Sequence, residues 1–141
     1  MPWTKVLIDK ADFEDTLGKK GLRGLTYRDA LLEAQRQLLE TDPAVFLIGE
    51  GIDDPGGVFG STLDLHKKFP ERVLDMPIAE NGLTGIAMGA AIAGMRPIFI
   101  HMRVDFLPMS MDMIVNHAAK WSYMTGGMVG VPLVIRSITG R

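Results

Sequence analysis

Short apolar runs alternate along this chain with longer stretches whose apolar residues recur at helical spacing. The short runs have the length and continuity of buried strands, and they lie at 45–48, 72–75, 97–102 and 131–135. Short continuous strands separated by helices indicate a parallel sheet with helices on its faces. The pattern therefore predicts an α/β fold with three layers, in which a mainly parallel sheet is flanked by helices.

The stretches between these runs carry helix signals. Thr26 is a good N-cap, the leucines after it form an apolar stripe, and Asp42-Pro43 ends this first helix. Three further helices are expected, at 61–69, 83–93 and 108–124. Pro70 limits the first of these, and Gly94 ends the second.

In parallel sheets, ligands bind beyond the carboxyl ends of the strands. Three segments of this chain are expected at that edge, namely 49–57, 76–81 and 103–108. Glu80 and Asp105 lie in two of these segments, so the sequence predicts that they converge on one edge of the sheet.

Glu80 is the main candidate for chemistry. It stands where a polar segment becomes a run of Gly, Ala, Ile and Met that is expected to form a helix buried on every side. A buried carboxylate is costly without a partner, so Glu80 is a candidate to exchange a proton with a ligand nitrogen. The alternative is a helix-entry residue whose carboxylate caps free N–H groups, and the residue pattern alone favours that alternative.

Small residues crowd the same helix. Gly85 and Gly89 are four residues apart and line one face, which allows a second helix or a bound ring to approach closely. Glycine costs a helix about 1 kcal/mol relative to alanine, so these residues need a packing reason. Tight packing onto the chain's own sheet and contact with another subunit are both consistent with the pattern.

Two further residues near the predicted edge are secondary candidates. Glu50 lies in Gly49-Glu50-Gly51, which lacks the spacing of a phosphate-binding loop but should face the same edge as Glu80. Phe106 follows the third strand; a lone aromatic residue is normally part of a core, and at this edge it is also placed to stack on a ring.

Composition and charge narrow the classes of function. The formal net charge of −2 gives no electrostatic reason to expect nucleic acid or an anionic membrane as a partner. No apolar run is long enough to span a bilayer, and the N-terminus resembles neither a signal nor a transit peptide, so we expect a cytoplasmic protein. There is no cysteine, and the three histidines lack metal-ligand spacing, so no metal site is expected.

From about residue 25 to residue 136 the chain resembles a known family. The matching stretches are LTYRDALLEA, VFLIGEGI, FPERVLDMPIAENGLTGIAMGAAIAGMRPI, DFLPMSMDMIVNHAAKWSYMTGG and VPLVIR, in the family's order. They are similar to the pyrimidine-binding domain of the thiamine-diphosphate enzymes of the transketolase superfamily. Within it they most resemble the β subunit of 2-oxoacid dehydrogenase E1 (pyruvate, branched-chain or acetoin type).

The resemblance implies roles for four residues. In that family a glutamate at the position of Glu80 pairs with N1′ of the aminopyrimidine and favours the imino tautomer, whose 4′-nitrogen removes the thiazolium C2 proton. The activated cofactor attacks a 2-oxo acid, and carbon dioxide leaves. By the same resemblance Phe106 stacks on the pyrimidine, Ile78 packs near it, and Glu50 lies close to the cofactor and to a subunit interface.

The chain also departs from the family pattern. Met109 stands where many family β subunits carry Gln, which puts a polar contact near the pyrimidine in question. SITGR at 137–141 stands where relatives read Gly-Pro-Asn-Gly and continue. The resemblance therefore implies an N-terminal extension at 1–24 and a pyrimidine-binding domain at 25–141, with the C-terminal transketolase domain and its histidine absent.

The sequence thus predicts the β-subunit-like part of a thiamine-diphosphate-dependent 2-oxoacid dehydrogenase, inactive as an isolated chain. The resemblance implies an E1 α-type partner that holds Mg²⁺ and the diphosphate, and the Gly/Ala-rich helix suggests self-association. Two alternatives remain: a split transketolase-like or 1-deoxyxylulose-phosphate-synthase-like enzyme, and a non-catalytic pairing module.

Overall fold

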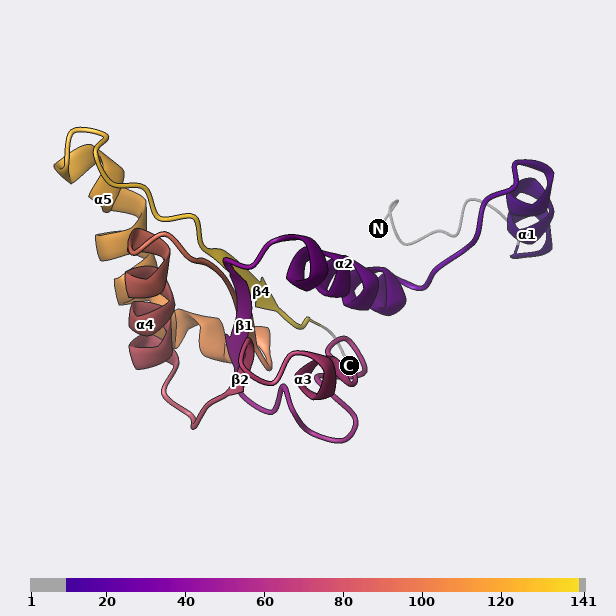
Figure 1. The fold of residues 1–141 in the computed structure, drawn as a ribbon, viewed down its shortest axis with the longest axis horizontal. Coiled ribbons are helices and arrows are strands. Elements are labelled where there is room, and N and C mark those ends of the chain that lie inside the picture. The colour runs from indigo at the N-terminus through magenta and orange to yellow at the C-terminus, as the bar shows by residue number, and fades with distance from the viewer. Residues whose placement is uncertain (1–9, 140–141) are drawn as a thin grey trace.

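The computed structural model describes residues 10–139, and its centre is a four-stranded parallel sheet (Figure 1). The strand order is β2-β1-β3-β4. The strands are β1 (Val45–Gly49), β2 (Val73–Asp75), β3 (Arg96–His101) and β4 (Val134–Ser137). Leu47 pairs with Val73 on one side and with Ile98 on the other, and every pairing is parallel. The predicted α/β class is confirmed.

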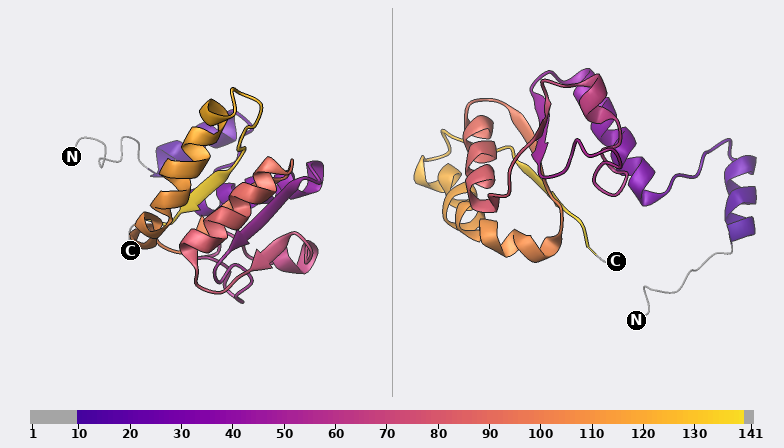
Figure 2. Two further views of the ribbon diagram at one scale, coloured as in Figure 1. Left: turned by 90° about the vertical axis from the view of Figure 1, so that its left-hand side faces the viewer. Right: turned by 90° about the horizontal axis from the view of Figure 1, so that it is seen from below.

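Helices cover both faces of this sheet. On one face lie α2 (Tyr27–Thr41) and the short α3 (Leu65–Lys68), and on the other lies α4 (Glu80–Ile92) (Figures 1 and 2). The chain after β3 forms η2 (Val104–Ser110), η3 (Asp112–Ala118) and α5 (Ala119–Met124) on the α4 side. The N-terminal α1 (Lys10–Lys19) lies clear of the sheet.

The two faces of the sheet carry separate cores, because alternate residues of a strand point to opposite faces. Both are built from strand residues that contact one helical layer. The α2 face buries Leu39, Val45, Leu47, Val73, Ile98 and Ile100, and the α4 face buries Phe46, Ile48, Leu83, Ala87 and Phe99. Every residue of β1 is buried, so this strand separates the two cores.

The prediction of one long helix over 108–124 is confirmed over 111–124, where the chain is helical without a break, but wrong in its start and in its pitch. The chain there forms the end of η2, a tight 3₁₀ helix that contains Pro108, then η3, a wide π-helix, and only then α5. Proline has no N–H to donate, so it suits the start of a helix or a short tight turn better than the interior of an α-helix. The apolar spacing of this segment predicted a helix but not its pitch.

Two other predicted boundaries differ from the structure. The last strand is β4 at Val134–Ser137 rather than 131–135, because Pro132 has no N–H and the N–H of Leu133 donates locally to Val131 O at 2.8 Å. The helix expected over 61–69 is only α3, since the residues before it form turns in which Thr62 Oγ1 accepts from Val58 N at 2.8 Å.

Arg72 ties the end of α2 to the sheet. Its guanidinium donates to Leu39 O at 2.6 Å, to Asp42 O at 3.1 Å and to Val45 O at 3.2 Å. The last carbonyls of a helix have no partner within the helix, so a charged donor at this end satisfies groups that burial would otherwise leave unpaired. One side chain therefore sets the connection between α2 and β1.

We expect Arg72→Met to lower the free energy of unfolding by about 2 kcal/mol, because it removes charge-assisted hydrogen bonds to half-buried carbonyls. Arg96→Met is the matched control: the Arg96 side chain is 68% exposed and pairs with Asp42 at 3.4 Å, which predicts a loss of about 0.5 kcal/mol or less. Urea unfolding of the two variants measures the difference, and equal losses would contradict this role of Arg72.

Candidate functional site

The carboxyl ends of three neighbouring strands bring titratable residues to one edge of the sheet. Glu50 directly follows β1, Asp75 ends β2, and His101 ends β3. Asp75 Oδ1 accepts from the backbone N–H of Ile52 at 3.0 Å, which holds the loop after β1 against β2. Glu50 Oε1 accepts from the backbone N–H of Ala79 at 3.3 Å, directly before Glu80.

Glu80 is the first residue of α4, and only 5% of its surface is exposed. The N-cap is Ala79, and no side-chain hydrogen bond caps this helix, so the structure does not support the capping interpretation. Within residues 10–139 the Glu80 carboxylate makes no hydrogen bond and no ion pair. A nearly buried carboxylate without an internal partner is costly, and a ligand that donates a hydrogen bond would relieve that cost.

Two buried hydroxyl groups hold the backbone of Glu80. Thr84 Oγ1 donates to Glu80 O at 2.7 Å, and Ser110 Oγ lies 3.1 Å from the same oxygen and 2.8 Å from Thr84 Oγ1. His101 Nε2 lies 3.3 Å from Ser110 Oγ. Thr84 and Ser110 are fully buried, and His101 is nearly so. This network joins β3 and η2 to the first turn of α4.

Sequence reasoning missed this network. Ser110 lay within an expected helix, Thr84 lay in an apolar run, and His101 showed no metal-ligand spacing. The available signal was the placement of small hydroxyl residues among apolar neighbours, as in Met109-Ser110-Met111. Buried hydroxyls need partners, so such residues indicate a polar contact in the core.

Burial and neighbouring charges shift two pKa values at this edge. Burial raises the pKa of Glu50, the charges of Glu80 and Asp75 raise it further, and the Ala79 N–H opposes the rise. Burial lowers the pKa of His101, and the negative charge of Glu80 offsets part of that effect. Glu80 therefore acts electrostatically on groups at the ends of both β1 and β3.

The other predicted residues lie at the surface. Ile78 is 81% exposed, Phe106 is 43% exposed and Met109 is 60% exposed. Asp105 follows β3 as expected, but its carboxylate accepts from Arg103 Nε at 3.2 Å among exposed side chains instead of meeting Glu80. Their roles toward a ligand stay predictions, because an exposed position does not by itself establish a contact with a ligand.

The two helix glycines differ in their surroundings. A methyl group added to Gly85 would lie 3.5 Å from Met113 Sδ of η3, whereas one added to Gly89 would meet nothing within 4 Å. Neither glycine packs on the sheet in the way that Leu83 and Ala87 of the same helix do. Gly85 thus faces η3, and Gly89 lies on an open face of α4.

Residues 10–139 contain no group of three or more His, Cys, Asp or Glu side chains placed to hold a metal ion. None of their helices is long and apolar enough to cross a membrane.

Residues 23–140 match the family model described as the transketolase pyrimidine-binding domain. The chain belongs to this family. It is 42% identical over 121 residues to the mitochondrial pyruvate dehydrogenase E1 component subunit beta-1 of Arabidopsis thaliana, a match that covers 85% of this chain and 33% of that protein. It is 44% identical over 117 residues to the pyruvate dehydrogenase E1 component subunit beta of Rickettsia bellii, covering 82% and 36%.

The human mitochondrial pyruvate dehydrogenase E1 component subunit beta is 42% identical over 117 residues, covering 82% of this chain and 33% of that protein. The chain thus spans about a third of the length of these family members. A similar solved structure, described as a split gene transketolase in an inactive beta4 tetramer, has a TM-score of 0.55 and 28% identity. That match covers 67% of this chain and 30% of the other.

The low pKa of His101 predicts a pH dependence of stability. Below pH about 6.5 the unfolded chain binds a proton that the buried native imidazole resists, so the free energy of unfolding falls as pH drops toward the lower native pKa. We expect His101→Leu to flatten this part of the curve. His117→Gln is the control, because the His117 side chain is 41% exposed, and it should keep the wild-type slope. An unchanged slope in His101→Leu would contradict the assignment.

Proposed function

We propose that this chain supplies the pyrimidine half of a thiamine-diphosphate site in a 2-oxoacid dehydrogenase of the E1 type. One observation carries the proposal: Glu80 is 5% exposed and its carboxylate has no partner among residues 10–139. The family model is named for pyrimidine binding, and the similar proteins are named pyruvate dehydrogenase E1 beta subunits. A nitrogen heterocycle is a fitting partner for such a carboxylate.

The residues present fit an aminopyrimidine. A ring nitrogen that carries a proton is a hydrogen-bond donor, and the Glu80 carboxylate is an acceptor on a residue that is only 5% exposed. When bound, thiamine diphosphate would supply the carbanion chemistry needed to release carbon dioxide from a 2-oxo acid. The protein's own part is to position the ring and to control one proton.

Each residue of the site has a defined task in this proposal. Glu80 holds the proton at the ring nitrogen, and Thr84 and Ser110 hold the Glu80 backbone so that its carboxylate stays aimed. Glu50 accepts a hydrogen bond from the backbone N–H of Ala79 and so places a second carboxylate close to Glu80. The exposed side chains of Phe106 and Ile78 offer apolar surface on which the ring stacks and packs.

The proposal includes a partner subunit. The similar proteins are named beta subunits, and the matched region covers about a third of each. We propose that an E1 α-type subunit completes the site and holds Mg²⁺ and the diphosphate. Exposed apolar side chains before α4 and along η2 and η3 offer a surface for it: Ile78, Phe106, Met109, Met111 and Val115.

Self-association is the second candidate. The similar split gene transketolase is described as an inactive beta4 tetramer, and α4 presents Ile86, 52% exposed, beside the open face at Gly89. This supports a state in which the chain pairs with its own copies without turnover. A transketolase-like reaction on sugar phosphates is the alternative chemistry.

We also propose a cytoplasmic location. The Rickettsia protein carries no compartment in its name, whereas the plant and human proteins are named mitochondrial. Cell fractionation followed by immunoblotting tests this location, and recovery of the chain in organelles would contradict it.

We expect Glu80→Gln to lower 2-oxo-acid decarboxylation by the assembly with its α-type partner by about a hundredfold or more, because the amide cannot hold the proton at the ring nitrogen. Circular dichroism should show an unchanged fold. Glu71→Gln, at an exposed position on the turn before β2, is the control and should keep normal turnover. Near-normal turnover of Glu80→Gln would exclude the proposed role.

Calorimetric titration with Mg²⁺ and thiamine diphosphate separates the candidates. Heat should appear when the α-type subunit is present and be weak with this chain alone, because half of the site lies in the partner. No heat under either condition would favour the non-catalytic pairing module. Ketol transfer instead of carbon dioxide release in the active assembly would favour the transketolase-like alternative.

A further inference from the structure

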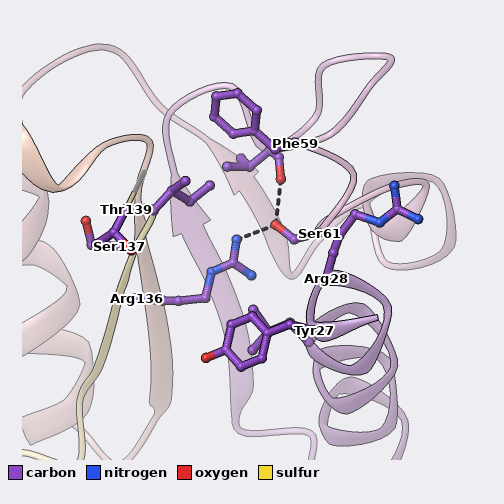
Figure 3. A pocket seen from close by; sticks show the side chains of 10 residues that line it. Tyr27, Arg28, Phe59, Ser61, Arg136, Ser137 and Thr139 are labelled. Atoms are coloured by element: carbon purple, nitrogen blue, oxygen red, sulfur yellow. Dashed lines mark hydrogen bonds between the residues drawn. The ribbon is translucent and has the colours of Figure 1, made fainter. Parts of the chain in front are cut away.

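A pocket lies on the opposite face of the sheet from Glu80. It is a cavity of about 280 Å³ formed by the start of α2, the turns after β1 and the end of β4. Figure 3 shows Arg136 reaching from β4 into this space between Tyr27 of α2 and Ser61. The pocket shares the carboxyl edge of the sheet with the Glu80 site but belongs to the α2 layer.

Two neutral side chains orient the Arg136 guanidinium. It donates to Gln35 Oε1 at 3.0 Å and to Ser61 Oγ. Gln35 and Ser61 are 4% and 5% exposed. Gln35 Nε2 donates in turn to Leu31 O and Ser61 O, so its amide oxygen faces the arginine. The guanidinium is therefore held in one orientation before any ligand arrives.

No carboxylate balances the charge of Arg136 within residues 10–139. Burial lowers the pKa of its guanidinium, and the phenol of Tyr27 is the group that opposes this effect. Arg28, on the wall of the pocket, is already paired with Asp29 at 2.7 Å. Arginine stays charged in proteins, so a half-buried guanidinium with neutral partners is a cation that lacks a counter-ion.

We propose that this pocket binds the oxyanion of a small organic molecule, a carboxylate or a phosphate, through Arg136. A guanidinium has five N–H donors. The bonds to Gln35 and Ser61 use one N–H each, so the other N–H donors of Arg136 are left for a ligand. The planar fork of a guanidinium suits two oxygens of one carboxylate or phosphate. The binding group is thus an anion that meets Arg136 at the inner wall.

The rest of the pocket indicates what the anion is attached to. Leu31 and Val58 give the pocket apolar walls, and Tyr27 and Phe59 are 83% and 67% exposed beside it. Phe59 has a φ of 48°, in the left-handed region that a bulky residue rarely adopts and that occurs at ligand sites. The ligand class is therefore an anion on an apolar or ring-shaped body.

This site is independent of the proposed cofactor site. Ile100, which pairs with Arg136 across the sheet, points into the α2 core, whereas Glu80 contacts residues of the α4 layer. Loss of one site therefore does not imply loss of the other.

The test is calorimetric titration of the full chain with three probes that share a ring: benzoate, phenyl phosphate and the neutral benzamide. We expect at least one anion to bind and benzamide to bind about tenfold more weakly or not at all. The tighter of the two anions assigns the ligand to carboxylates or phosphates. Failure of both anions to bind, or equal binding of benzamide, would overturn the proposal.

Variants assign the binding to Arg136. Arg136→Met should weaken anion binding by about tenfold to a hundredfold, and Arg28→Gln, the matched rim control, by about threefold or less, since Asp29 already pairs with Arg28. Because Arg136→Met could unfold the chain, NMR of the wild-type arginine Nε–Hε groups gives a second readout. The anion that binds more tightly should shift the Arg136 signal at the concentrations that produce heat; an unmoved signal during binding would sink the assignment.

Discussion

The structure depends on the pairing of β1 with parallel neighbours on both of its edges. The five residues of β1 are all buried, and the strand is hydrogen-bonded to β2 on one side and to β3 on the other. Parallel strands cannot be joined by a tight hairpin, so the chain must cross over a face between them and return to the same end. The helical layers, the two cores and the common edge of strand ends all follow from this constraint.

That common edge concentrates charge, with a different sign on each face. The α4 face presents Glu80 together with Glu50, and the α2 face presents Arg136 beside Arg28. The sheet lies between them, and no ion pair joins Glu80 to Arg136 within residues 10–139. Each is instead held by neutral polar neighbours, hydroxyls around the Glu80 backbone and an amide and a hydroxyl around Arg136. Hydrogen bonds with neutral groups orient a charged side chain but leave its charge unbalanced.

The parts of this fold that depend on residues close together in the sequence could be predicted from it. Thr26 does cap α2 by accepting from Asp29 N, and the run ending in Gly49 is β1. The changes of pitch after β3 could not be predicted, since the α-helix differs from the 3₁₀ and from the π helix by less than one residue per turn and apolar spacing does not separate them. Pro132 shifted β4 for a reason that lies in the hydrogen-bond ladder rather than in hydropathy.

The candidate site was predictable to a similar extent. A lone carboxylate at the mouth of an apolar helix singled out Glu80, and its burial is as expected. His101 and Ser110 escaped notice because they are nine residues apart and meet only when η2 folds back onto α4. Ile78 and Phe106 are exposed, so the packing of this chain does not test the roles that the resemblance implies for them.

The placement of Glu80 makes its proposed role compete with the stability of the fold. A carboxylate that is nearly enclosed and unpaired within the described chain lowers the stability of the fold, and a neutral side chain of similar size would remove that penalty. Selection for thermostability alone would therefore act against Glu80. If the proposed role is right, a lineage that no longer needed it would be expected to lose Glu80 early while it kept Thr84, Ser110 and the sheet beneath them.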